Sequence, residues 1–132
     1  AGGRFLVELD VRNQSQRKSI LEVRAAANER LPLAALKGKP EAAGWSAHAQ
    51  GGEIRIAAGE RKHALSSGGS LGARLLFHER RGPDSVSIFQ AREMRGQTLL
   101  SVVVRFDDGT EERQGLPVPF IPRLSPSLEK EL

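Results

Sequence analysis

Three histidines, His48, His63 and His78, are the first side chains in this sequence that could bind a metal or transfer a proton. A metal site needs ligands that converge in space, usually with a carboxylate behind each histidine. None of the three stands two or four residues from another histidine or a well-placed aspartate. We therefore expect structural or surface histidines, with no metal and no cofactor. An enzyme whose residues converge only in three dimensions stays open, and it requires a deep pocket holding one of these histidines beside a carboxylate.

The groups needed for nucleophilic catalysis and phosphate binding are missing. The chain contains no cysteine, and no serine lies in a Gly-x-Ser-x-Gly elbow. The glycine-rich stretch GGSLGARLL, at 68–76, lacks the Gly-Lys-Ser/Thr ending of a phosphate loop. The acidic stretch DDGTEE, at 107–112, does not have calcium-loop spacing and is explained as a charged hairpin tip. We expect a protein that is not an enzyme.

Basic residues offer a different chemistry. Lysine and arginine number 20 against 16 acidic residues, a net charge of +4, and such an excess favours anionic partners. Binding of nucleic acid or another polyanion on a small β-barrel is the alternative function, with affinity that falls steeply with salt. Aromatic residues interleaved with the basic ones, which stack on single strands, are lacking. The basic residues of this alternative, expected on one face, are Arg12, Arg17, Lys18, Arg61, Lys62, Arg80 and Arg81.

The stretch LPVPFIP, at 116–122, combines apolar side chains with prolines. Proline donates no backbone hydrogen bond, so Leu116–Ile121 cannot be a fully paired central strand. It is either an edge strand, whose prolines protect the outer edge, or an extended arm that docks on a partner by strand addition or in an apolar groove. In the second case the partner-binding residues are Leu116, Pro117, Val118, Pro119, Phe120, Ile121, Arg113 and Arg123.

Alternation of apolar and polar residues predicts the strands that position these groups. Residues 4–12 place Phe5, Val7, Leu9 and Val11 on one face. The stretch 35–45, with Gly38, Pro40 and Gly44, is expected to be a connecting loop. Asp108-Gly109 predicts a hairpin turn. The other expected strands are 19–25, 45–50, 53–58, 73–79, and 85–94 with 97–106 as a hairpin around Gly96. The expected core is Trp45, Val7, Leu9, Val23, Ile54, Ile56, Leu76, Ile88, Leu100, Val102 and Val104.

About seven or eight short strands without a long helical pattern predict an all-β protein, an antiparallel sandwich or small barrel. At 132 residues the chain fits one domain, expected over 1–124, with a C-terminal tail or linker at 125–132. No stretch is apolar enough to span a membrane. The start at Ala-Gly-Gly, without methionine, suggests a processed chain or an excised domain.

Short motifs in roughly the first 65 residues point to a more specific architecture. The matching positions are Val11, Asn13, Ser15, Gly44, Trp45, Ile54, Ile56, Gly59 and Glu60. In this pattern the chain resembles immunoglobulin-like accessory domains of bacterial envelope proteins. The resemblance implies an immunoglobulin-like sandwich and the periplasm or cell envelope rather than the cytoplasm, but no active site. It ends after Glu60, where RKHALSSGGSLG interposes a glycine-serine break.

The expected function is therefore a non-catalytic protein-binding or assembly module of a larger protein or complex. The partner is expected to be a protein, and a homo-oligomer is one form of such an assembly. The proline-rich arm and an arginine rim would make the contact. Arginine suits this role because its planar fork pairs with carboxylates while its stem covers apolar surface.

Overall fold

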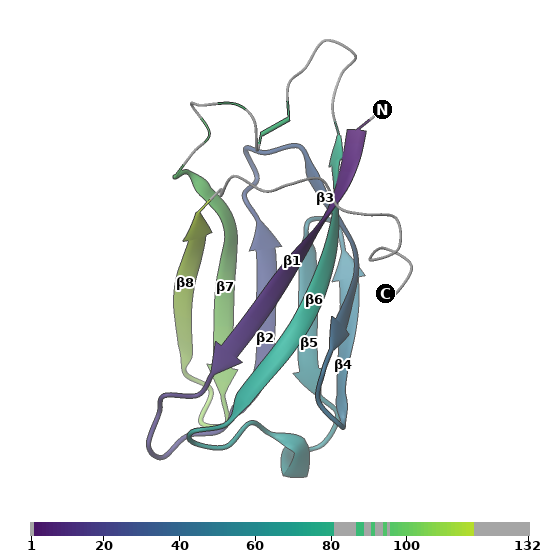
Figure 1. The fold of residues 1–132 in the computed structure, drawn as a ribbon. Helices are drawn as coiled ribbons and strands as arrows, with labels where there is room; N and C mark the ends of the chain where they lie inside the picture. Colours follow the sequence, from purple (N-terminus) through teal and green to yellow (C-terminus); the bar gives the residue numbers. More distant parts are fainter. Residues whose placement is uncertain (1, 81–86, 89–90, 92–93, 95, 118–132) are drawn as a thin grey trace.

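Two antiparallel β-sheets lie face to face in a sandwich (Figure 1). The structure is a computed structural model that describes residues 2–80, 87–88, 91, 94 and 96–117. One sheet has the strand order β1-β6-β3 and the other β4-β5-β2-β7-β8. The strands are β1 (Gly2–Arg12), β2 (Ile20–Ala27), β3 (Leu33–Pro40), β4 (Trp45–Gln50), β5 (Glu53–Ala58), β6 (Ser70–Arg80), β7 (Thr98–Phe106) and β8 (Glu111–Pro117).

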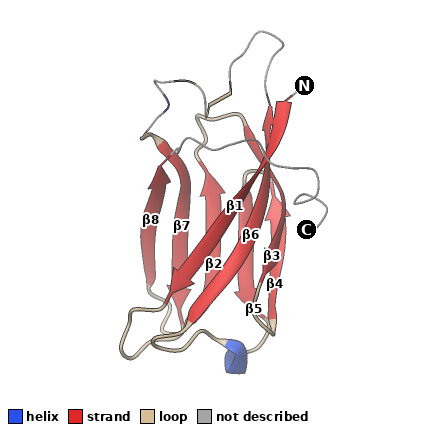
Figure 2. Ribbon diagram, in the orientation of Figure 1, coloured by secondary structure: helices blue, strands red, loops and turns tan. Residues whose placement is uncertain are grey.

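These eight strands confirm the all-β sandwich predicted from alternation. A short 3-10 turn, η1 (Arg61–His63), lies at the lower end in Figure 2. No helix within the described ranges is both long and apolar enough to cross a membrane. The expected turn at Asp108-Gly109 is present, since Gly109 takes a φ of +87° and its N–H donates to the Phe106 carbonyl.

The core lies between the inward faces of the two sheets. Phe5 of β1 stacks on Phe77 of β6 with ring centroids 5.6 Å apart. The predicted core residues of this interior are confirmed, although Val7 and Val104 are only half-buried against it. Leu76 is buried as predicted but does not belong to the core cluster. The predicted residues in the cluster are Leu9, Val23, Trp45, Ile54, Ile56, Ile88, Leu100 and Val102.

The predicted loop at 35–45 is wrong over its first part, because β3 continues to Pro40. Gly38 is small because a Cβ at this position would lie 2.9 Å from Cγ2 of Ile54 in the opposite sheet. Pro40 is tolerated because β3 is an edge strand, paired with β6 alone. Both residues therefore serve a strand, although they are ordinary loop signals.

The hairpin predicted between 85–94 and 97–106 is also wrong. Strand β7 has β2 along one edge and β8 along the other, which leaves no edge for a further strand. The described residues Ser87, Ile88, Ala91 and Met94 are not in strands. Ser87 and the backbone N–H of Ile88 instead donate hydrogen bonds to the buried carboxylate of Glu79, at 3.1 and 3.3 Å.

The β1–β2 connection is held by one buried side chain, Asn13. Its amide nitrogen donates to the carbonyls of Lys18 and Leu65, at 2.7 and 2.8 Å. Its side-chain oxygen accepts from the N–H of Ser15 at 2.9 Å. The motif position Asn13 thus ties two loops together at the end of the sandwich that carries η1, which we call the η1 end.

A second corner at the η1 end is built from Gly44, Trp45, Gly59 and His63. The Trp45 indole donates to the His63 carbonyl at 2.7 Å, and the Gly59 N–H donates to the Gly44 carbonyl at 2.8 Å. Gly44 has a φ of +81°. The Gly-Trp and Gly-Glu motifs therefore form one structural unit.

Candidate binding surfaces along β8

Strand β8 borders the open side of the sandwich. It pairs with β7 through Thr98↔Pro117 to Arg105↔Glu111 and is the last strand of its sheet. The facing edge of the other sheet is β1. On the opposite side, β3 and β4 approach, and the Ala35 N–H donates to the Gly51 carbonyl at 2.8 Å. In the described part of the chain, the sandwich is closed along β3 and β4 and open between β1 and β8.

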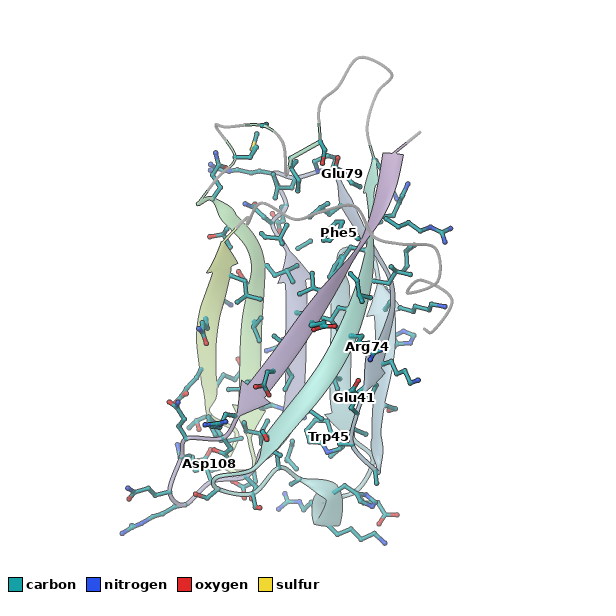
Figure 3. All side chains as sticks on the ribbon, viewed as in Figure 1. Phe5, Glu41, Trp45, Arg74, Glu79 and Asp108 are labelled. Atoms are coloured by element: carbon teal, nitrogen blue, oxygen red, sulfur yellow. The ribbon has the colours of Figure 1, made fainter. Side chains whose placement is uncertain are left out.

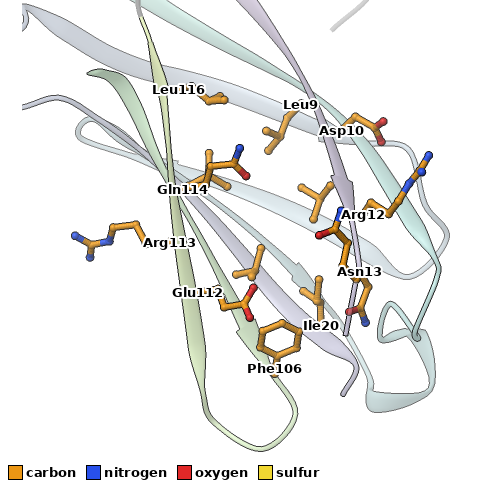
Figure 4. Close-up of a pocket in the computed structure, with 14 residues that line it drawn as sticks. Leu9, Asp10, Arg12, Asn13, Ile20, Phe106, Glu112, Arg113, Gln114 and Leu116 are labelled. Atoms are coloured by element: carbon orange, nitrogen blue, oxygen red, sulfur yellow. The ribbon is translucent and has the colours of Figure 1, made fainter. Parts of the chain in front are cut away.

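A groove of about 450 Å³ runs along this open side (Figure 4). Apolar side chains of the core form its floor, and Asp10 and Arg12 of β1 lie along one wall. Strand β8 forms the other wall with Glu112, Gln114 and Leu116, a face exposed except for the half-buried Leu116. The floor residues are Leu9, Val11, Ile20, Val102, Val104 and Phe106.

Alternation along β8 divides its side chains between two surfaces. Glu112 and Gln114 point into the space between β8 and β1, whereas Arg113 points away from it (Figure 4). On the outer face of the five-stranded sheet, Arg113 lines a second hollow of about 590 Å³ together with Arg24 and Arg30. Both sequence-predicted residues on β8, Arg113 and Leu116, line the groove, and Arg113 also lines the second hollow.

The second hollow is lined largely by polar side chains, and some of its charged groups already form ion pairs. Arg24 forms an ion pair with Glu111, and its Nε atom is buried without a hydrogen-bond partner in the described residues. Glu29 and Glu53 also line the hollow. A partner with carboxylates could therefore bind to guanidinium groups here, since these groups pair well with carboxylates in fork geometry.

A neighbouring charge cluster stabilises the same outer face. The Glu22 carboxylate, 8% exposed as a residue, forms ion pairs with Arg55, whose Nε lies 3.0 Å away, and with Arg105, whose Nε lies 3.2 Å away. Partners of opposite charge offset the cost of burying a carboxylate. Arg55 and Arg105 thus pair with Glu22, as Arg24 of the second hollow pairs with Glu111.

The basic residues expected on one face do not all meet. Arg80 pairs with Gly2 at one end of β1, while Arg12 pairs with Ser70 at the other, about 30 Å apart at the rise of a β-strand. That these residues share one face stays a prediction, and Arg81 lies outside the described residues. The basic residues gathered at the η1 end are Arg12, Arg17, Lys18, Arg61 and Lys62.

Acidic partners reduce the charge of this basic cluster. Lys18 Nζ lies 3.1 Å from Asp108 Oδ2, and Lys62 Nζ lies 3.3 Å from Glu60. Hydrogen bonds from the side chain and backbone of Thr110, followed by Lys18, lower the pKa of Asp108 from 3.8 to about 2. The Asp108 carboxylate, labelled in Figure 3, is therefore ionised at neutral pH and opposes polyanion binding at this end.

The histidines do not converge. His48 lies in β4, His63 in η1 and His78 in β6, so they come from both sheets and one end of the sandwich. Among the described residues, no group of three histidines, aspartates or glutamates could hold a metal ion. A third hollow of about 360 Å³ contains Glu8, Asp10 and Glu41, but Arg74 lies among them, with its Nε 3.3 Å from Glu41 (Figure 3).

The predicted arm is only partly described. Leu116 and Pro117 belong to β8, which is an edge strand, as the first of the two interpretations required. Val118, Pro119, Phe120, Ile121 and Arg123 lie outside the described residues, as does the rest of the expected domain to 124 and the tail 125–132. The outer arginines Arg24 and Arg30 were missed, because their places in β2 and the β2–β3 turn carry no arm or cluster signal.

Neither the family models nor the curated proteins contain a match to this chain. Several solved structures, however, match its fold. A protein from Nocardia farcinica, described as having an immunoglobulin-like fold, matches with a TM-score of 0.55 and 14% identity, over 95% of this chain and 83% of that one. At such low identity the similarity establishes the fold alone, and the immunoglobulin-like sandwich predicted from the motifs is confirmed.

Two longer proteins share the same fold. The major pilin subunit of Bacillus cereus matches with a TM-score of 0.55 and 9% identity, over 90% of this chain and 34% of that one. A putative membrane-anchored protein from Corynebacterium diphtheriae matches with a TM-score of 0.59 and 10% identity, over 94% of this chain and 32% of that one. This chain thus spans about a third of the length of each.

Proposed function

We propose that this chain is a non-catalytic protein-binding or assembly module of a larger protein or complex in the bacterial envelope. Its contact surface is the segment Leu116–Ile121, with Arg113 and Arg123 beside it. One observation carries the proposal: the segment starts on an edge strand, at the groove between β1 and β8 and next to the arginine-lined hollow. The naming of two neighbours as a pilin subunit and a membrane-anchored protein supports the envelope setting.

The sequence of the segment suits recognition through one edge. In an extended strand, side chains and backbone polar groups both alternate from residue to residue. Val118 and Phe120 would share one face, and their N–H groups one edge, whereas Pro117 and Pro119 leave the other edge without donors. Such a segment can add to the free edge of a partner's sheet and present two apolar side chains to it, but it cannot pair on both sides.

A Phe120→Ser change tests this role in the full chain. We expect the wild-type mass to rise with concentration between about 10 μM and about 1 mM, because weak assembly contacts have dissociation constants in this range. The variant should remain monomeric, with a melting temperature within about 2 °C of wild type. Light scattering and thermal unfolding provide the two readouts.

The matched control for this experiment is Ile121→Ser, whose side chain would lie on the other face of an extended segment. It should reduce assembly less than Phe120→Ser does. A wild-type chain that stays monomeric throughout, or a Phe120→Ser variant that unfolds, would remove the support for an assembly arm.

Polyanion binding at the η1 end is the second candidate, favoured by the five basic residues gathered there: Arg12, Arg17, Lys18, Arg61 and Lys62. Counterion release makes such binding strongly salt-dependent. A steep loss of affinity for DNA with added salt would favour this candidate, whereas contacts of the apolar arm should tolerate salt.

A further inference from the structure

The outer face of the five-stranded sheet has a low floor where two small side chains meet. Ala26 of β2 and Ser101 of β7 lie opposite each other in the register and line the second hollow of about 590 Å³. Because these side chains are short, the longer ones around them form the rim of the hollow. Glu53 of β5, which pairs with Ala26, stands on one side, and Arg113 of β8 stands on the other.

The charged groups on these two sides, Arg113 and Glu53, form no ion pair within the described residues. On each strand the opposite charge two residues away, on the same face, is already paired. Glu111 pairs with Arg24, and Arg55 pairs with a carboxylate of β2. Strands β2 and β7 lie between β5 and β8, so three strand spacings, about 14 Å, separate Arg113 from Glu53.

The turn between β2 and β3 closes a third side of the hollow with Glu29 and Arg30. Asn28 fastens this turn to β7. Its side-chain nitrogen donates to the Thr98 carbonyl at 2.8 Å, and its backbone N–H donates to the Leu99 carbonyl at 3.0 Å. Glu29 and Arg30 add one charge of each sign. The rim therefore carries separated positive and negative groups instead of charges of one sign.

We propose that the second hollow binds a mixed-charge segment of a partner protein, with a carboxylate beside Arg113 and Arg24 and a cationic side chain beside Glu53. In an extended segment, side chains four residues apart share one face and lie about 14 Å apart, which matches the separation of the two sides. A polyanion fits less well, because Glu53 and Glu29 repel it. The inference rests on the proposed function for its protein partner and adds the charge pattern of that partner.

Two peptides of equal length test this charge pattern on the full chain. In the block peptide, a run of glutamates is followed by an equal run of lysines, whereas the glutamate peptide contains glutamate alone. The backbone amide shifts of Ala26 and Ser101, followed by NMR during each titration, report binding at the hollow itself. Affinities are taken from these two residues, so that binding at the η1 end is not counted.

Wild type should bind the block peptide about 3-fold or more tightly than the glutamate peptide, although its net charge of +4 alone would favour the latter. Arg113→Gln should weaken binding of the block peptide about 3-fold, the size expected for one exposed ion pair. Glu53→Gln should abolish the preference between the peptides. The charge-matched controls, Lys39→Gln on β3 and Glu60→Gln before η1, should change each affinity by less than about 1.5-fold.

Three results would overturn the inference. Amides of Ala26 and Ser101 that do not respond to the block peptide would show that it does not bind in the hollow. A glutamate peptide that binds there as tightly as the block peptide would indicate a polyanion site. An Arg113→Gln effect no larger than that of Lys39→Gln would leave only long-range attraction.

The peptide titration and the light-scattering test separate this inference from the proposed function. A chain that assembles while its hollow ignores the block peptide refutes this inference and leaves the proposed function standing. A chain that binds the block peptide in the hollow but stays monomeric contradicts the assembly arm alone.

Discussion

A Gly44→Ala substitution should lower the free energy of unfolding by about 2–4 kcal/mol, since it combines left-handed backbone strain with overpacking. Gly44 has a φ of +81°, and a Cβ there would overlap the His63 ring, well inside 3.0 Å. The ring cannot withdraw freely, because the His63 carbonyl accepts the Trp45 indole hydrogen bond at 2.7 Å. The substitution therefore destabilises the corner that joins β4 to η1.

Urea unfolding of Gly44→Ala beside Gly51→Ala separates the two causes. Gly51 also has a positive φ, +60°, but nothing lies within 4 Å of its ideal Cβ. Its variant should lose only the backbone strain, about 1–2 kcal/mol. Equal losses at the two positions would mean that the contact between Gly44 and His63 is not a constraint on the fold.

An Asn13→Ala substitution should lower the free energy of unfolding by about 2–4 kcal/mol, because it leaves several buried polar groups without hydrogen-bond partners. The side chain is 1% exposed and satisfies the carbonyls of Lys18 and Leu65 and the N–H of Ser15. Water cannot replace it without opening the loops. Equilibrium unfolding in urea measures the effect.

Two companion variants assign the Asn13 effect to its hydrogen bonds. Asn13→Asp keeps the acceptor for Ser15 but removes both donors, so its loss should be as large as that of Asn13→Ala. The exposed neighbour Gln14 should tolerate alanine within about 0.5 kcal/mol. An Asn13→Ala variant as stable as Gln14→Ala would show that the hydrogen bonds of Asn13 do not stabilise the fold.

The sequence revealed the strands whose signals were purely periodic and misplaced those that depend on tertiary contacts. Alternation located β1, β5 and β7, since one face of each is buried. Strand β3 was hidden because Gly38 and Pro40 imitate a loop, although a close approach to Ile54 and an edge position explain them. The stretch 85–94 alternates like a strand, but β2 and β8 already occupy both edges of β7.

In the candidate site, too, alternation could be read from the sequence, whereas features that depend on tertiary contacts could not. Period-2 alternation is enough to separate Arg113 from Leu116. In the structure Leu116 lines the groove, while Arg113 lines the second hollow as well. The contribution of Arg24 and Arg30 depends on sheet order, which brings β2 within reach of β8 across β7. Leu76 was assigned to the core from hydrophobicity alone, and only the register shows that it faces outward.

The central claim is that the sandwich is complete at Pro117 and that recognition resides in the segment after it. Light scattering with thermal unfolding on the full chain and on a chain ending at Pro117 tests it most directly. This cut keeps Gly115–Pro117, which pair with β7.

We predict that the shorter chain unfolds cooperatively and remains monomeric, while the full chain assembles as its concentration rises. A shorter chain that has no cooperative transition would show that residues after Pro117 complete the core. A shorter chain that assembles as well as the full one would move the recognition surface to the sandwich itself. Either result would contradict the claim.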